Sequence, residues 1–283
     1  MKKFIFSCAL VVLAGILFFT VINPSLPENY GKVETRLFLS DQQNQPLIVG
    51  FGGSEGGNPL ASDKMKLTRD LFIQNGYAFL AVAYFGTSKT PESLDRISLN
   101  AIYDSIVQAA QHPLINKDKI ILYGESRGGE LVLNLASRYK NLAGVIVMVP
   151  PHVSLPSKFG WRATPSWTFN DEGIPYVKAS GKSMQLIWDG DFYAGFVELL
   201  KDKKLINGAE IEVEKINCPV LIMSAKNDKV WPSEYMAGEI MDRLRSNNFS
   251  HYYEQIALDG GHGEPSNHTD TVIRFLHTHL NKK

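Results

Sequence analysis

Short apolar runs alternate with segments of helical period through most of the chain. The runs that favour β-strands are residues 34–40, 46–51, 77–84, 119–123, 143–149, 219–225 and 252–258. Apolar residues at helical spacing lie between them, in residues 64–74, 99–109, 130–136, 236–244 and 272–280. Strands separated by helices imply right-handed crossovers. The pattern therefore predicts a mostly parallel sheet with helices on both faces.

Residues 150–214 interrupt this alternation. The segment is rich in Pro, Gly and aromatic residues, and its sequence shows no clear strand or helix period. A long stretch of this kind is a lid or a disordered loop, and the many aromatic residues favour the lid. We therefore expect an aromatic-rich lid insertion above the sheet that forms an apolar acyl pocket.

The amino terminus carries an apolar segment at residues 4–22, preceded by Lys2 and Lys3. Its length reaches the roughly 18–20 residues that a membrane-spanning helix needs, and it exceeds the usual apolar core of a signal peptide. The lysines predict that this end stays cytoplasmic and the rest of the chain lies outside. We expect a signal peptide or signal anchor at 1–23, a linker and first strand at 24–45, and one catalytic domain at 46–283.

Composition narrows the class of partner. Lys plus Arg equals Asp plus Glu, at 29 each, so the chain has no electrostatic footprint for nucleic acid. Cys8 lies in the apolar segment and Cys218 precedes a strand, which excludes a disulfide framework. The histidines show no metal-ligand spacing. We expect a small-molecule substrate, attachment to a membrane through the amino-terminal segment, and no metal or cofactor.

A nucleophile elbow is predicted at Ser126. The sequence Gly124-Glu125-Ser126-Arg127-Gly128 follows an apolar strand and leads into a helix. A serine hydroxyl is a poor nucleophile unless it is held exposed beside a base, and a strained turn flanked by glycines presents it in that way. The strand and helix around the motif make it more specific than the five residues alone.

An acid and a histidine follow the elbow in the chain order that such a hydrolase requires. Asp228 comes after the strand at 219–225, and His262 comes after the strand at 252–258, flanked by glycines. His262 would take the proton of Ser126, and Asp228 would orient the imidazole. The alternatives are that Asp228 is a solvated turn residue and that His262 is an ordinary loop histidine.

The oxyanion hole needs two backbone donors. We expect one from the N–H of Arg127, at the start of the elbow helix, and the second from Gly53 or Ser54 in the glycine-rich loop 50–57. That loop lacks the lysine and the spacing of a phosphate-binding loop. We also expect the Arg127 side chain to be solvated, with binding of a substrate anion as the alternative.

Two aromatic residues and one acid complete the candidate set. Tyr84 and Phe85, at the end of a central strand, are candidates for substrate binding or for the core. Glu130 is expected to cap the elbow helix or to pair locally.

These motifs resemble the C-terminal domain shared by acyl-CoA thioesterases and bile acid-CoA:amino acid N-acyltransferases, from about residue 46 to the end. The similarity is carried by residues 52–57, 76–86, 124–131, 166–168, 174–177, 211–216, 227–233 and 261–265. It implies an α/β-hydrolase fold and a catalytic triad of Ser126, Asp228 and His262. The acyltransferases of this family have cysteine at the elbow, so a serine implies hydrolysis of an acyl thioester through an acyl-enzyme.

Two other functions remain open at this stage. An exported or membrane-anchored carboxylesterase would use the same residues on an ester of a small molecule or lipid. A non-catalytic module that binds an acyl ligand is the third alternative. It gives no reason for an acid, a base and an elbow serine to occur together.

Overall fold

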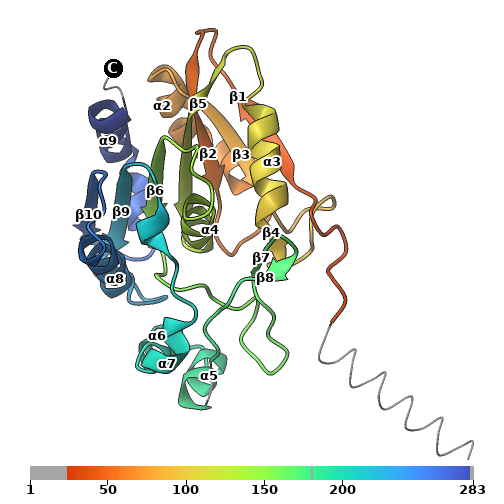
Figure 1. Ribbon diagram of the computed structural model, residues 1–283, viewed down its shortest axis with the longest axis vertical. Helices are drawn as coiled ribbons and strands as arrows, with labels where there is room; N and C mark the ends of the chain where they lie inside the picture. Colours follow the sequence, from red (N-terminus) through yellow and green to blue (C-terminus); the bar gives the residue numbers. More distant parts are fainter. Residues whose placement is uncertain (1–23, 180, 281–283) are drawn as a thin grey trace, which may run out of the picture.

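Seven strands form the central sheet of the protein (Figure 1). The computed structural model describes residues 24–179 and 181–280. In the order in which they lie across the sheet, the strands are β1 (Glu34–Phe38), β3 (Ala78–Ala83), β2 (Gln45–Phe51), β5 (Ile115–Glu125), β6 (Gly144–Met148), β9 (Val220–Ala225) and β10 (Tyr253–Leu258). Only the edge strand β1 pairs antiparallel; the other neighbouring strands are parallel. All carboxyl ends of the parallel strands therefore lie at one edge.

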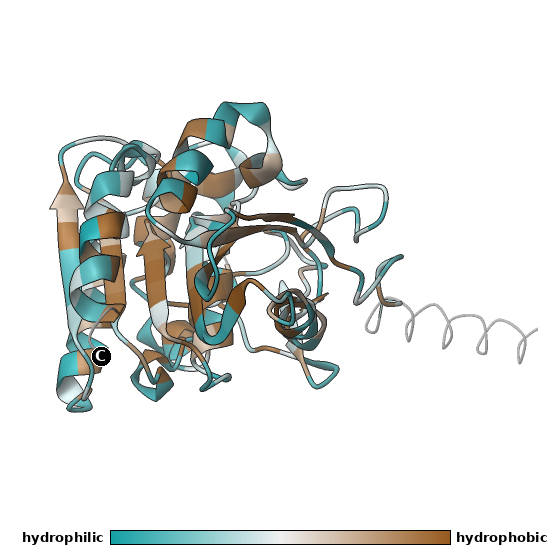
Figure 2. Cartoon of the chain, turned by 90° about the horizontal axis from the view of Figure 1, so that it is seen from above, coloured by the Kyte–Doolittle hydropathy of each residue, from teal (hydrophilic) through white to brown (hydrophobic). Residues whose placement is uncertain are grey.

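Helices cover both faces of this sheet. They are α2 (Lys66–Gln74), α3 (Leu99–Ala109), α4 (Arg127–Ala136), α8 (Ser233–Ser246) and α9 (Thr269–Leu280). A first apolar core contains residues of α3, α4 and α8, and a second contains residues of α2 and α9. The central strands are hydrophobic along nearly their whole length (Figure 2), as expected for strands that are buried on both faces.

The predicted fold class is confirmed. A strand overlaps each apolar run that favoured one, and a helix overlaps each segment of helical period. The strand β3 shows why the pattern is readable, because all of its residues are buried and β-formers or small apolar residues fill it. Helix α3 buries Leu99, Ile102 and Ile106, which lie on the face that the periodicity indicated.

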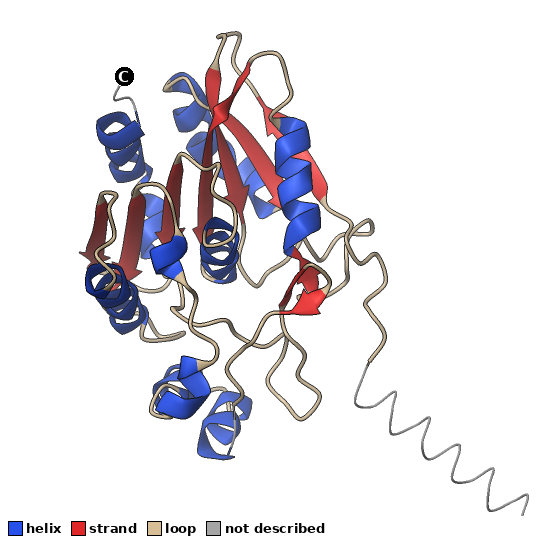
Figure 3. Cartoon of the chain, in the orientation of Figure 1, coloured by secondary structure: helices blue, strands red, loops and turns tan. Residues whose placement is uncertain are grey.

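The insertion between β6 and β9 has more regular structure than the sequence predicted. It contains β7 (Trp167–Phe169), β8 (Glu172–Gly173), α5 (Gly181–Trp188), α6 (Phe192–Leu199) and α7 (Lys203–Asn207) (Figure 3). The helices have eight residues or fewer, so each is too short for a helical period to stand out in the sequence. Strands β7 and β8 form a small second sheet with β4 (Ile97–Ser98).

The predicted signal segment 1–23 lies outside the described residues. Within residues 24–179 and 181–280, no helix has the length and apolar character needed to cross a bilayer. The boundaries expected at residues 23 and 45 stay predictions. The strand β1, in the segment expected to hold a linker and first strand, belongs to the central sheet.

Candidate active site

Ser126 lies in a strained turn between β5 and α4. Its φ of 57° and ψ of −119° fall in a region that side-chain-bearing residues rarely adopt. The turn also requires glycine on both sides. A Cβ on Gly124 would lie 2.3 Å from the carbonyl oxygen of Gly128, and a Cβ on Gly128 would lie 2.4 Å from the carbonyl oxygen of Gly52. The local geometry is that of a nucleophile elbow, pressed against the glycine-rich loop.

Asp228 and His262 are hydrogen-bonded to each other. Asp228 follows β9, His262 follows the adjacent strand β10, and the His262 Nδ1 atom lies 2.8 Å from Asp228 Oδ2. The other carboxylate oxygen accepts hydrogen bonds from the backbone N–H groups of Val230 and Trp231. Burial acts to raise the pKa of Asp228, but these hydrogen bonds and the charge of His262 outweigh it, and the pKa lies below its ordinary value.

The loop that carries His262 lies beside the elbow. The Ser266 hydroxyl donates a hydrogen bond of 2.7 Å to Glu125, the residue before Ser126. Burial raises the pKa of Glu125, opposed by the Ser266 hydrogen bond and the His262 charge. Among the described residues, no hydrogen bond joins the Ser126 hydroxyl to His262. In enzymes without a substrate such bonds are often long and tighten in the substrate complex.

The two candidate N–H donors in the glycine-rich loop after β2 differ in whether they already have an acceptor. The N–H of Gly53 donates to Glu55 Oε1 at 3.0 Å, whereas in the described residues the N–H of Ser54 has no acceptor. Gly53 also lies against Ser126, because a Cβ on Gly53 would be 3.3 Å from the Cβ of Ser126. The N–H of Arg127 is the first of α4 and has no acceptor within the helix. Gly53 can serve an oxyanion only if Glu55 turns away.

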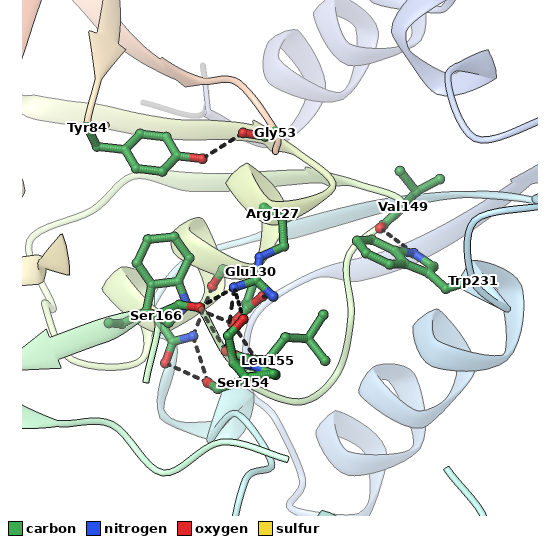
Figure 4. A network of polar contacts seen from close by, with 12 residues as sticks. Gly53, Tyr84, Arg127, Glu130, Val149, Ser154, Leu155, Ser166 and Trp231 are labelled. Carbon is green, nitrogen blue, oxygen red and sulfur yellow. Dashed lines mark hydrogen bonds and ion pairs between the residues drawn. The ribbon is translucent and has the colours of Figure 1, made fainter. Parts of the chain in front are cut away.

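Tyr84 and Phe85 support this loop from within the core. The Tyr84 hydroxyl donates to the carbonyl oxygen of Gly52 at 2.7 Å, with a longer contact to that of Gly53 (Figure 4). Phe85 packs so closely that a Cβ on Gly56 would lie 2.8 Å from its ring. Both side chains are buried. These contacts belong to loop packing, and a role of either residue in substrate binding stays a prediction.

The expectation that the Arg127 side chain is solvated is wrong. The side chain is buried, and its Nη1 atom lies 3.0 Å from the carboxylate of Glu130. Its Nη2 atom donates to the hydroxyl of Ser166 and contacts the carbonyl oxygens of Leu155 and Pro156. The reason is that the insertion covers the first turn of α4 (Figure 4), whereas the local sequence pattern predicted that this turn is exposed to solvent.

Glu130 pairs locally, as expected, and also holds the insertion. Its Oε1 atom accepts hydrogen bonds from the backbone N–H of Leu155, at 2.8 Å, and from the indole N–H of Trp167, at 2.6 Å (Figure 4). Burial raises the pKa of Glu130, opposed by Arg127 and these two donors. Ser166 and Trp167 complete this network, and the sequence pattern did not predict their part in it. The spacing of Arg127 and Glu130 by three residues on one helix was the signal available for the pair.

Models of two known protein families match this chain. A family model described as the C terminal of BAAT and acyl-CoA thioester hydrolases matches residues 103–263, more than half of the 283 residues. A second model, described as an alpha/beta hydrolase of unknown function, matches residues 29–156. The resemblance inferred from the motifs is thereby confirmed.

Curated relatives include acyl-coenzyme A thioesterases. The mitochondrial acyl-coenzyme A thioesterase 2 of Mus musculus is 26% identical over 222 residues, which is 78% of this chain and 46% of that protein. Acyl-coenzyme A thioesterase 1 of Homo sapiens is 26% identical over 225 residues, which is 78% of this chain and 49% of that protein. The chain thus spans about half the length of these relatives.

Solved structures with the same fold cover nearly all of the chain. The complex of DcsB with its substrate analogue has a TM-score of 0.59 at 14% identity and covers 88% of this chain and 95% of that chain. Est1E of Butyrivibrio proteoclasticus, bound to ferulic acid, has a TM-score of 0.57 at 18% identity and covers 88% of this chain and 96% of that chain. At these identities the similarity establishes the fold alone.

Proposed function

This chain belongs to the family of the C-terminal domain of BAAT and acyl-CoA thioester hydrolases, and we propose that it is a serine hydrolase that cleaves acyl thioesters. The observation that carries the proposal is the hydrogen bond between His262 and Asp228. The loop of His262 lies beside Ser126, which occupies a strained turn. A loop histidine or a turn aspartate without a catalytic role would have no reason to meet at this edge of the sheet.

In the proposed reaction, the Ser126 oxygen attacks the carbonyl carbon of the thioester. His262 takes the hydroxyl proton, and its charged form is stabilised by Asp228, whose lowered pKa keeps the carboxylate ionised. The carbonyl oxygen becomes an oxyanion held by the N–H groups of Arg127 and of Ser54 or Gly53. The C–S bond then breaks, and His262 returns the proton to the leaving thiolate.

Water resolves the acyl-enzyme in the second half of the reaction. His262 removes a proton from water as the oxygen attacks the acyl carbon, and the same proton returns to Ser126 as the ester bond breaks. The products are a thiol and a carboxylic acid. A serine at position 126 supports hydrolysis, because an oxygen ester is readily resolved by water through the same base.

The substrate class rests on the relatives, whose names state acyl-coenzyme A as their substrate. Because this chain spans half of their length, the identity of the leaving group is a separate proposal. We also propose that residues 4–22 attach the chain to a membrane with residues 24–283 outside the cytoplasm. This placement favours a second candidate function, an exported or membrane-anchored carboxylesterase, since acyl-CoA is an intracellular metabolite.

Comparison of the hydrolysis rates of three substrates that carry the same acyl group separates these proposals. The purified chain would be assayed with the acyl-CoA, a simple alkyl thioester and an oxygen ester, with the Ser126→Ala variant as the control. A thioesterase should show higher kcat/KM on the thioesters, and contacts to the nucleotide part should raise it further for the CoA form. Equal rates on all three would favour the carboxylesterase.

Acyl-chain length tests the pocket. An apolar acyl pocket should increase transition-state stabilisation by roughly 0.8 kcal/mol per added methylene until the pocket is full.

Turnover that survives in Ser126→Ala at the wild-type rate would refute the role of Ser126 as the nucleophile. No turnover of any ester or thioester by the folded protein would instead favour a module that binds an acyl ligand.

A further inference from the structure

Four large aromatic side chains of the insertion point into solvent. Trp161 is 90% exposed, Trp188 60%, Phe192 47% and Tyr193 41%. By contrast, Trp167 in the same insertion is fully buried. We call the four exposed residues the aromatic tip. Exposed aromatic residues gathered in one place mark an interaction surface.

Two segments bring the aromatic tip together. Trp188 ends α5, and Phe192 and Tyr193 begin α6 after a three-residue turn. Trp161 lies in the loop before β7. The indole N–H of Trp188 donates to the carbonyl oxygen of Phe159 at 3.2 Å, which joins the helical pair to that loop. The four side chains therefore belong to one end of the insertion, at which α5 and α6 stand apart from the sheet (Figure 1).

The same pair of residues holds this loop and the first described residues of the chain. Asp95 accepts a hydrogen bond of 2.5 Å from the hydroxyl of Thr164, at the base of the loop. Its neighbour Arg96 donates from Nη1 to the carbonyl oxygen of Pro24 at 2.7 Å, and from Nη2 to that of Ser25 at 2.8 Å. Arg96 is in turn paired with Asp95 at 2.8 Å. The chain thus enters the described structure beside the base of the aromatic loop.

This anchor limits how far Trp161 can be from the apolar segment. Trp161 is three residues from Thr164, and three residues span at most about 11 Å. The apolar segment 4–22 ends two residues before Pro24, a distance of at most about 7 Å. If the segment lies in a bilayer, Arg96 and Asp95 hold the base of the loop that carries Trp161 beside the point where the chain leaves it.

We propose that the aromatic tip inserts into the headgroup region of the lipid bilayer to which the amino-terminal segment attaches the chain. Tryptophan and tyrosine favour this region because their rings are apolar and their N–H and O–H groups remain hydrated. Lys158 and Arg162 are exposed on either side of Trp161 and would meet lipid phosphates. The insertion leaves the carboxyl end of β6, the edge that carries Ser126, so acyl substrates would reach the site from the membrane surface.

The proposal rests on the proposed membrane attachment and is independent of the chemistry at Ser126. The full chain would be reconstituted in phosphatidylcholine vesicles with and without bromine on the acyl carbons nearest the headgroups, and tryptophan emission would be measured. The segment 1–23 has no tryptophan, so the emission comes from Trp161, Trp188 and the buried pair Trp167 and Trp231. Bromine quenches only indoles that reach the lipid.

We expect strong quenching of the wild type and loss of quenching in the double variant Trp161→Phe with Trp188→Phe. The matched control adds Tyr252→Trp to that double variant, because Tyr252 is 45% exposed and precedes β10, at the opposite edge of the sheet. This third indole should stay unquenched. Turnover of a soluble thioester by the same samples reports on the proposed function, and should be the same in all three proteins.

Three results would overturn the proposal. One is unquenched wild-type emission from protein that floats with the vesicles, which would also be the result if another protein molecule covered the aromatic tip. Another is equal quenching of the Tyr252→Trp control. The third is failure of the full chain to float with vesicles, which would remove the membrane attachment as well. Absence of thioester turnover alongside the expected quenching would contradict only the proposed function.

Discussion

Removing one partner of the buried pair Arg127 and Glu130 should destabilise the fold far more than removing both charges. Both side chains are buried and lie 3.0 Å apart. At that distance and an effective dielectric constant of about 20, the attraction is about 5 kcal/mol. Glu130→Gln keeps the side-chain volume and an acceptor for Trp167 but leaves the guanidinium unpaired. We expect a loss of about 3–5 kcal/mol in the free energy of unfolding.

Urea unfolding of a double-mutant cycle measures this coupling. The cycle contains Glu130→Gln, Arg127→Met and the double variant, and we expect the double variant to lose less stability than either single variant. The matched control is Glu212→Gln, which removes an exposed partner of Lys215 and should cost under about 1 kcal/mol. Additive single effects, or a cost below 1 kcal/mol for Glu130→Gln, would refute the reasoning.

Three further variants test the elbow and a buried histidine. Ser126→Gly should be about 1 kcal/mol more stable than Ser126→Ala in urea unfolding, because glycine relieves the strained φ, and equal stability would contradict the strain. Gly128→Ala should abolish turnover and lower stability by about 1–3 kcal/mol, since its Cβ would lie 2.4 Å from the carbonyl oxygen of Gly52; an active variant would show that the loop contact is dispensable. Burial lowers the pKa of His152 from 6.5 to about 4, so the unfolded state binds the proton first as pH falls. The stability that the neutral side chain contributes is therefore complete above pH 6.5 and is lost as pH falls to about 4. His152→Phe should remove about 3 kcal/mol of that pH dependence, and an unchanged slope would contradict it.

The sequence predicted the fold because the sheet depends on local pattern. A central strand such as Ala78–Ala83 is apolar along its whole length. The elbow motif is recognisable in the sequence by the glycines that flank Ser126. The meeting of Asp228 with His262 was also predictable, since both follow adjacent parallel strands in the order that the hydrolase fold requires.

Tertiary contacts of the insertion could not be read in this way. Arg127 is buried by Ser166 and by backbone groups about thirty residues away, and no local periodicity encodes that cover. The exposure of Trp161 was equally hidden, because an aromatic residue in an irregular segment fits a pocket wall and a surface loop alike. The contact of Glu55 with the Gly53 amide depends on loop geometry that composition does not specify.

Covalent labelling at Ser126 tests the central claim most directly. A fluorophosphonate reacts only with a serine that a neighbouring base activates, and peptide mass spectrometry locates the adduct. We predict a single adduct on Ser126 in the wild type, strongly slowed labelling in His262→Ala, and none in Ser126→Ala. A folded wild-type protein that stays unlabelled, or an adduct on another serine that persists in Ser126→Ala, would contradict the account.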